Sequence, residues 1–283
     1  MSSAPVRYLL FDVESVVDGA LLKAIEYPDE PYSPEQAIAV CQKERLEKVG
    51  REFIPYTFQF PVSVAVAKID QEFNIIELVT LDADQYRPEV ITRDFWNGWK
   101  HYREAAMKSK KEVSLVTFNG RHFDIPLLEL SAFRYGIEIG DWMSNKGPSY
   151  EHPRNRYNRW SHLDMQDFVT NFGATRFNGG LNLLSQLLSK PGKMGVAGHM
   201  VQDLYHSGEM KRINDYCRCD VLDTYFVFLR SRVMCGELAL EKEQEIVAQT
   251  LTWLQSMADD GDTAMAEYID HCGVWENPWK VSS

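Results

Sequence analysis

Two acidic residues, Asp12 and Glu14, stand one residue apart near the end of an apolar run that begins at Val6. Short runs rich in aromatic and β-branched residues are typical of buried strands, in which residues i and i+2 point to the same face. The two carboxylates therefore lie side by side, where they repel each other and are costly to desolvate without a cation between them. Hard oxygen ligands suit Mg²⁺ or Mn²⁺, so the pair predicts a metal site. The alternative is a solvated strand end.

A third acidic residue, Asp124, belongs to the stretch FNGRHFDIP at residues 118–126. The stretch follows an expected strand and opens an expected helix, and ligands of α/β sheets usually lie at such strand ends. An aspartate at this place can also cap the helix. Capping and metal binding are compatible, so Asp124 is a candidate ligand.

Tyr216 and Asp220 are four residues apart on an expected helix. This spacing puts both side chains on one face, so the carboxylate can bind a metal while the phenol reaches a water beside it. Asp223 lies three residues further on and is the rival ligand. A solvated acidic stripe with a half-buried tyrosine is the structural alternative.

Taken together, Asp-x-Glu, Asn-Gly-x-x-Phe-Asp and Tyr-x-x-x-Asp resemble, in content and order, the three motifs of the DEDD exonuclease superfamily, and the tyrosine is typical of its DEDDy branch. More narrowly, the chain is similar to the predicted 3′–5′ exonucleases related to the proofreading domain of family B DNA polymerases. The stretches LNLL at residues 181–184 and PGK at residues 191–193 also resemble that family. The resemblance covers about residues 6 to 235.

The resemblance implies a metal-dependent 3′–5′ exonuclease that hydrolyses single-stranded nucleic acid with two divalent ions, Mg²⁺ or Mn²⁺. It favours DNA over RNA as the substrate, while the catalytic acids serve both. It implies that Tyr216 orients the attacking water and that Asn119 and Phe123 contact the terminal nucleotide. The implied metal ligands are Asp12, Glu14 and Asp220 for the first ion, and Asp12 with Asp124 for the second.

The elements that must position these residues predict an α/β protein, and the resemblance implies a ribonuclease H-like mixed sheet. Its expected content is three antiparallel strands plus parallel strands, flanked by helices. The expected strands lie at residues 6–15, 61–67, 73–79, 113–118 and 163–165. The expected helices lie at residues 33–49, 92–108, 124–135, 182–189, 209–235 and 237–257. In the fifth strand, Asp164 either caps the next helix or stands behind the site.

An irregular segment between residues 142 and 162 alternates basic and aromatic side chains, a pattern that suits single-stranded nucleic acid. Its alternative is a surface loop whose rings cover the core. The residues are Trp142, Lys146, Tyr150, Arg154, Arg156, Tyr157, Arg159 and Trp160.

The formal charge of −11 opposes nucleic-acid binding, but it is unevenly distributed. From Gly236 to Ser283 there are ten acidic residues and two lysines, which leaves a charge of −3 on residues 1–235. We expect residues 1–235 to form the exonuclease domain and residues 236–283 to form an acidic helical extension packed on it. Trp275 and Trp279 should anchor that extension to the body.

Composition sets the remaining bounds. The 283 residues are 45% hydrophobic and 25% charged, which is typical of a globular protein, and no apolar run reaches the length of a membrane span. The first five residues lack the pattern of a signal peptide, so we expect a cytoplasmic protein. Five irregularly spaced cysteines argue against a disulfide framework or a zinc site.

Two other functions compete with the exonuclease. A phosphatase of the haloacid dehalogenase type would use Asp12 as its nucleophile, but that family has an aspartate where Glu14 stands and a late acidic pair after a strand. Here the late pair, Asp259 and Asp260, follows a helical pattern. A non-catalytic nucleic-acid-binding module on the same fold is the second alternative, although all four acids and the tyrosine are present.

Overall fold

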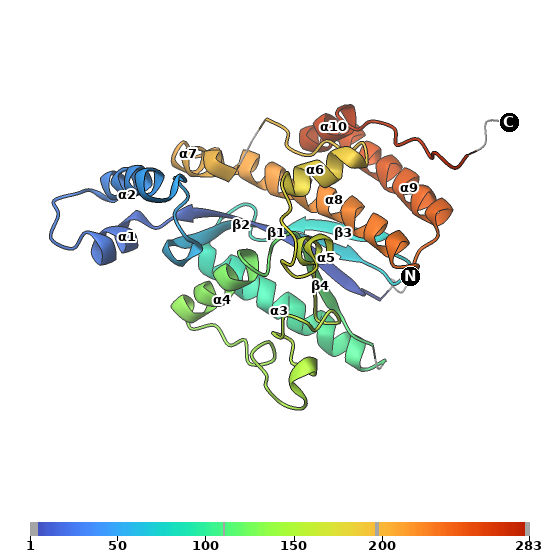
Figure 1. The fold of residues 1–283 in the computed structure, drawn as a ribbon, viewed down its shortest axis with the longest axis horizontal. Helices are drawn as coiled ribbons and strands as arrows, with labels where there is room; N and C mark the ends of the chain where they lie inside the picture. Colours follow the sequence, from blue (N-terminus) through green and yellow to red (C-terminus); the bar gives the residue numbers. More distant parts are fainter. Residues whose placement is uncertain (1–4, 110, 196–197, 281–283) are drawn as a thin grey trace.

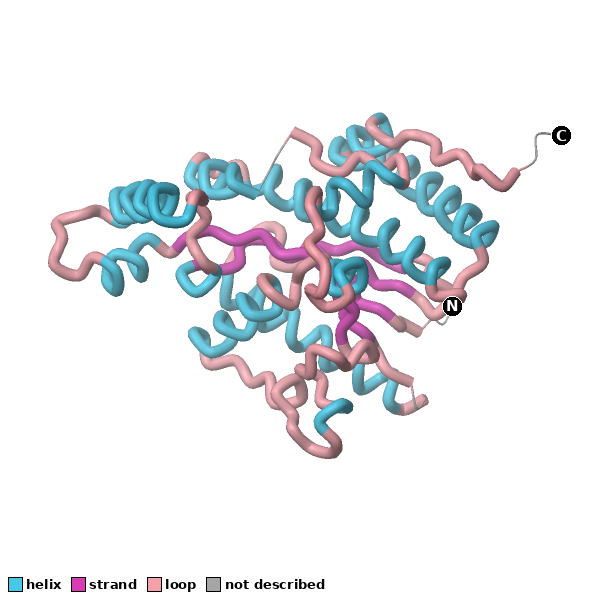
Figure 2. The backbone as a smooth tube through the Cα atoms, viewed as in Figure 1, coloured by secondary structure: helices cyan, strands magenta, loops and turns pink. Residues whose placement is uncertain are grey.

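A mixed sheet of five strands forms the centre of the computed structural model, which describes residues 5–109, 111–195 and 198–280 (Figures 1 and 2). The strand order is β3-β2-β1-β4-β5. Strand β2 is antiparallel to both β1 and β3, whereas β4 runs parallel to β1 and β5 parallel to β4. The predicted α/β fold class, with a ribonuclease H-like sheet of three antiparallel and further parallel strands, is confirmed. The strands are β1 (Tyr8–Val17), β2 (Gln59–Ile69), β3 (Ile75–Thr80), β4 (Ser114–Thr117) and β5 (His162–Asp164).

Helices cover both faces of the sheet (Figure 1). The α-helices are α1 (Gly19–Glu26), α2 (Pro34–Val49), α3 (Pro88–Met107), α4 (Asp124–Tyr135), α5 (Met165–Thr170), α6 (Gly180–Leu187), α7 (Val201–His206), α8 (Met210–Met234), α9 (Leu240–Asp259) and α10 (Thr263–Asp270). The predicted helices at residues 33–49 and 124–135 are confirmed. Helix α2 begins with a capping box of Ser33 and Gln36, and ends at Gly50 in the left-handed conformation that glycine readily adopts.

The alternation of side chains along β1 divides the core into two layers. Tyr8 and Leu10 pack with the residues of α8, whereas Leu9, Phe11 and Val13 pack on the other face with α3 and α4. The face that carries Tyr8 and Leu10 is also the face of Asp12 and Glu14. The apolar part of this strand face therefore fixes where the two acids point.

Helices α1 and α2 form an arm that extends from one end of the sheet (Figure 1). No helix was expected between residues 15 and 33, but α1 forms there. Asp18 is its N-cap, and the Asp18 side chain accepts from the Leu21 amide at 3.0 Å. The arm has a small core of its own that includes Leu22 and Ile38. Helix α1 is therefore stabilised by its N-cap and also by contacts with residues distant in the sequence.

The C-terminal segment packs against α8, on the same side of the sheet as that helix. Helices α9 and α10 contact each other and α8. The guanidinium of Arg230 lies 4.1 Å from the centre of the Trp275 ring, so this indole is anchored as predicted. Trp279 is 78% exposed, so the prediction that it packs on the body is wrong. The boundary at residue 235 falls in the turn between α8 and α9 and stays a prediction.

Candidate active site

Asp12 and Glu14 project from β1 toward Asp220 of α8. One carboxylate oxygen from each of the three residues lies within 4.8 Å of the others. Asp12 pairs with Ala65 of β2 and Glu14 with Ser63, and the register shifts immediately after Glu14. Such bulges re-aim side chains and are frequent beside active sites. The predicted cluster of strand and helix acids is therefore present, with three of the four expected carboxylates in mutual reach.

Asp124 approaches the same point from the other layer of the structure. It is the first residue of α4, whose N-cap is Phe123, so the capping alternative for Asp124 is wrong. Its side chain is buried, and its charge raises the pKa of both Asp12 and Glu14. Asp124 is therefore close enough to act electrostatically on the cluster, but it lies outside the set of three.

A tight turn between β4 and α4 brings Asp124 there. Asn119 adopts a left-handed conformation with φ of 64°, which asparagine tolerates better than most residues. At Gly120, an added Cβ would lie 2.5 Å from the hydroxyl oxygen of Thr117. Only glycine fits this turn without displacing the end of β4, which explains the Asn-Gly pair.

Burial and mutual repulsion make the ionised form of these acids costly. The pKa of Asp12, Asp124 and Asp220 is raised to about 8 in each case, and that of Glu14 is raised well above its usual range, with desolvation as the largest cause. The Asp124 charge contributes to the raised pKa of Asp12, and the Asp12 charge contributes to that of Asp220. A divalent cation would offset this repulsion, because the ionised carboxylates would become its ligands.

Tyr216 lies one helical turn before Asp220, as predicted. Burial raises the pKa of its phenol, and the charges of Asp220, Glu14 and Asp12 raise it further. The group is therefore neutral at physiological pH and can donate a hydrogen bond. It is suited to holding a water molecule rather than to removing a proton.

Two other acids of α8, the rival Asp223 and the nearby Asp215, have partners outside the cluster. Tyr268 of α10 donates a hydrogen bond of 2.7 Å to the buried carboxylate of Asp223. Asp215 pairs with Lys211 at 2.5 Å and with Arg218 at 3.4 Å. Neither belongs to the acidic cluster found among the described residues. The register that puts Asp220 in the cluster is thus the one adopted.

Two candidate contacts to substrate lie on the turn before α4. The ring of Phe123 is half-buried and lies 5.9 Å from the ring of Phe53, centre to centre. Phe53 is 56% exposed and follows the α2 arm, a segment that no sequence motif linked to the site. Asn119 is also partly exposed, so its side chain is open to a ligand.

Asp164 supports this turn from β5. Its Oδ1 accepts from the amide of Asn119 and its Oδ2 from that of Arg121, each at 2.9 Å. Oδ1 also accepts from the amide of Gln166 and caps α5. Both roles considered for Asp164, helix cap and support behind the site, are therefore present in one buried side chain.

Sequence reasoning missed two residues near the acids. The thiol of Cys217 donates to the backbone oxygen of Asp12 at 3.3 Å, which ties α8 to β1. Lys193 is exposed, and its positive charge lowers the pKa of Asp220, although burial and Asp12 dominate that pKa. The PGK stretch resembles the family, but nothing in the local sequence indicates that it lies near Asp220.

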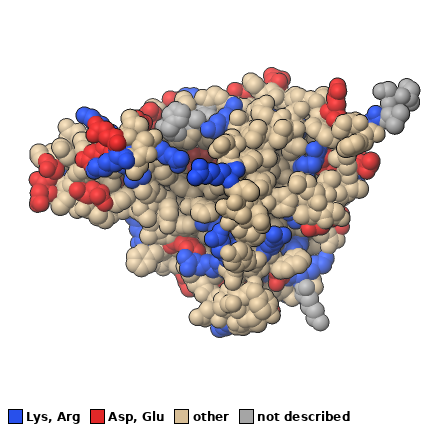
Figure 3. All heavy atoms as spheres, viewed as in Figure 1, with Lys and Arg blue, Asp and Glu red and all other residues tan. Residues whose placement is uncertain are grey.

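Lys193 is held at the rim of a hollow of about 480 Å³ that reaches Asp220. The side chain of Asn182 accepts from the Lys193 amide at 3.0 Å. Gly192, with φ of 63°, packs against the same asparagine so closely that a Cβ would collide with it. Figure 3 shows Lys and Arg side chains over the middle of this face, while many acidic side chains lie on the arm of α1 and α2.

The model of one protein family matches residues 51–272, which is more than half of the chain. The family is described as a predicted 3′–5′ exonuclease related to the exonuclease domain of PolB. The chain belongs to this family. It is therefore an enzyme of the exonuclease class, as the ordered motifs predicted. The matched range begins after β1 and reaches α10, so it differs at both ends from the range of 6 to 235 expected for the resemblance.

The chain is also similar to a solved structure, that of E. coli Exonuclease I in complex with a dT13 oligonucleotide. The identity is 13% over 87% of this chain, and the TM-score is 0.33. The match covers 43% of Exonuclease I, so this chain spans less than half of that protein. No curated protein matches the sequence. Across the described residues, no helix has the length and apolar character required to cross a membrane.

Proposed function

We propose that this exonuclease removes nucleotides from the 3′ end of single-stranded nucleic acid, with DNA preferred over RNA, by a mechanism that depends on two divalent ions, Mg²⁺ or Mn²⁺. The observation that carries the proposal is the cluster of Asp12, Glu14 and Asp220, whose carboxylate oxygens lie within 4.8 Å of one another. Family membership supports the exonuclease reaction. The family's relation to a DNA polymerase domain supports the preference for DNA.

The donor set fits hard divalent ions. Every candidate ligand is a carboxylate, and burial is the largest cause of the raised pKa of each one. The charge of Lys193 lowers the pKa of Asp220 too little to offset burial and Asp12, so a bound cation would stabilise the ionised groups. Asp12, Glu14 and Asp220 would hold one ion, and Asp12 with Asp124 would hold the second. Bound ions of this kind lower the pKa of water and neutralise charge on the phosphoryl oxygens. This assignment makes the four acids a DEDD set and Tyr216 its DEDDy tyrosine.

The other residues of the site position the substrate and the water. Tyr216 donates from its neutral phenol to the attacking water and orients it toward the phosphorus. Phe123, supported by Phe53, would pack against the terminal base, while Asn119 would hydrogen-bond the terminal nucleotide. Lys193 stands where its ammonium group can pair with a phosphate beside Asp220. These contacts hold the scissile phosphate in line with the water, which supplies much of the catalysis in phosphoryl transfer.

The test is a degradation assay with 5′-labelled single-stranded DNA and RNA of equal sequence, incubated with Mn²⁺ or Mg²⁺. We expect a ladder of products shortened from the 3′ end, formed faster from DNA. Asp12→Asn should abolish the ladder, whereas the matched control Asp215→Asn, which alters an ion-paired acid outside the cluster, should retain it. Full activity of Asp12→Asn would contradict the proposal. So would a ladder that forms only from strands whose 3′ end is blocked.

A further inference from the structure

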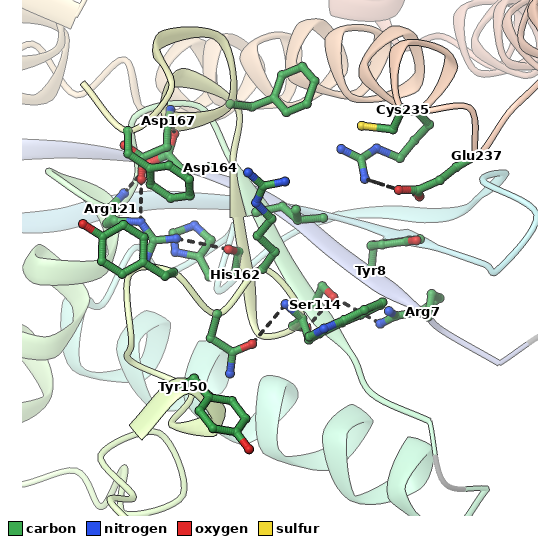
Figure 4. Close-up of a pocket in the computed structure, with 18 residues that line it drawn as sticks. Arg7, Tyr8, Ser114, Arg121, Tyr150, His162, Asp164, Asp167, Cys235 and Glu237 are labelled. Carbon is green, nitrogen blue, oxygen red and sulfur yellow. Dashed lines mark hydrogen bonds and ion pairs between the residues drawn. The ribbon is translucent and has the colours of Figure 1, made fainter. Parts of the chain in front are cut away.

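A second hollow, of about 460 Å³, lies along β5, the edge strand of the sheet (Figure 4). We call it the aromatic hollow. Figure 4 shows Asp164, Arg121 and His162 on one side of it, with Arg7 and Ser114 at the other end. Its lining includes the rings of Tyr150, Tyr157, Trp160 and Phe172 and the cations of Arg7 and Arg159.

Three of these rings are far more exposed than a core would require. Tyr150 and Trp160 are each 67% exposed, and Tyr157 is 64% exposed. Trp142, from the same irregular segment, is 1% exposed and packs against Trp96 and Trp99. Trp142 therefore fulfils the core-covering role that the sequence left open, and the prediction that it serves binding is wrong. The three exposed rings have no such role.

Positive charge accompanies the rings. The guanidinium of Arg7 is held by the Glu112 carbonyl at 2.5 Å, and that of Arg159 lies 5.5 Å from the centre of the Phe172 ring. Within the part of the chain that the structure describes, neither arginine forms an ion pair with a carboxylate. Arg121, in contrast, is paired with Asp167 at 2.8 Å. Asp167 and Glu237 also line the hollow, but they are paired with Arg121 and Arg232. Arg7 and Arg159 therefore add positive charge beside the exposed rings.

The aromatic hollow is joined to the active site by Asp164. This carboxylate lines the hollow and also accepts from the amides of Asn119 and Arg121, on the turn that leads to Asp124. If the 3′ nucleotide of a nucleic-acid strand binds at Asn119, the aromatic hollow therefore lies on the other side of the same turn. An unrelated protein partner would have no such link to the catalytic turn.

We propose that the aromatic hollow binds nucleotides of the single strand upstream of the reacting end, by stacking bases on Trp160 and Tyr157 and by pairing phosphates with Arg159 and Arg7. Every base has a flat face, so such stacking tolerates any sequence, and each base–ring contact contributes strongly to affinity. The inference rests on the proposed function for the identity of the ligand. The hollow would be a second contact that strengthens the binding of long nucleic-acid strands but not of the shortest ones.

The experiment uses the full chain carrying Asp12→Asn, so that the strand is not degraded, and 5′-fluorescein-labelled oligo-dT of 20 nucleotides. Fluorescence anisotropy gives the Kd. Trp160→Ala should weaken binding at least about fivefold, the lower end expected for loss of one stacked base. Arg159→Gln should weaken binding and reduce its salt dependence. The matched control is Phe133→Ala, which removes a ring that is 86% exposed on α4, and it should leave the Kd unchanged.

Equal Kd values for the parent, Trp160→Ala and Arg159→Gln would overturn the proposal. So would a sedimentation experiment in which Trp160→Ala dissociates a dimer while the Kd is retained, because the rings would then serve self-association. In the active chain, Trp160→Ala should raise the KM for a 20-mer much more than the KM for a dinucleotide. If the parent hydrolysed neither substrate, the proposed function would be wrong. The anisotropy test would still show whether the hollow binds the strand, because it measures the Kd without hydrolysis.

Discussion

Asp220→Asn should make the metal-free protein more stable while it abolishes activity. Burial, followed by the nearby charge of Asp12, raises the pKa of Asp220 from 3.8 to about 8. The folded protein therefore retains a proton that the unfolded chain has released above about pH 4. Folding stability contributed by this group is full below pH 4 and is lost as the pH rises toward 8. Asparagine does not titrate, so it avoids that loss.

The magnitude follows from the shift. A shift of about four pKa units corresponds to about 5 kcal/mol at pH 8 as an upper limit, because each unit is about 1.4 kcal/mol. Movement of the neighbouring acids and entry of water reduce this figure. We expect a net gain on the order of 2 kcal/mol, which raises the Tm of a chain of this size by about 4–8 °C. At pH 4 this effect should produce little difference in stability between the variant and the parent.

The assay is thermal unfolding followed by circular dichroism at pH 4 and pH 8, first with EDTA and then with Mn²⁺. The parent should gain stability with Mn²⁺, by about 2.7 kcal/mol when the ion is at a hundred times its Kd. Asp220→Asn should gain much less. The matched control is Asp215→Asn, five residues earlier on α8, which removes ion pairs with Lys211 and Arg218 and should give no stabilisation at pH 8.

Two results would refute this reasoning. One is a metal-free Tm for Asp220→Asn that falls below that of the parent at pH 8, since the buried charge would then not be costly. The other is an undiminished Mn²⁺-dependent gain in Tm for the same variant, since Asp220 would then not be a ligand. Activity alone does not separate these cases, which is why the unfolding data are needed.

Three further predictions concern neighbouring groups. Tyr216→Phe should lower kcat about a hundredfold while the Mn²⁺-dependent rise in Tm is retained, because the phenol orients water and is not a ligand. Tyr268→Phe should lower the free energy of unfolding by about 1–3 kcal/mol in urea titrations, because Asp223 loses its hydrogen bond inside the protein, and an unchanged urea midpoint would contradict this. Lys193→Ala should raise KM for oligonucleotides and reduce the slope of log KM against log salt by about one, whereas an unchanged slope would remove the lysine from phosphate binding.

The acids of the site were predictable where regular structure fixes their geometry. A period of two on β1 puts Asp12 and Glu14 on one face, and a spacing of four on α8 aligns Tyr216 with Asp220. The same spacing favoured Asp220 over Asp223, but the partner of Asp223 had no local signal. Tyr268 of α10, 45 residues later in the chain, donates to one oxygen of that carboxylate.

Other features depended on packing that no periodicity encodes. The indole of Trp142 fills a gap between α3 and α4, so its burial follows from the shape of that layer. Phe53 reaches Phe123 because the α2 arm returns to the body at that point. Lys193 lies near Asp220 only because Asn182 fixes the intervening loop. These are contacts between elements, and local patterns carry little information about them.

The two-layer division of β1 has a consequence for changes in chain length. Tyr8, Leu10, Asp12 and Glu14 share one face, and Leu9, Phe11 and Val13 share the other. Insertion of a single residue between Leu10 and Asp12 would rotate both acids into the apolar layer beneath the sheet and bring Val13 toward α8. Insertion of two residues would restore the facing but move the acids by about 7 Å along the strand. This strand can therefore vary in the identity of its apolar residues much more readily than in their number.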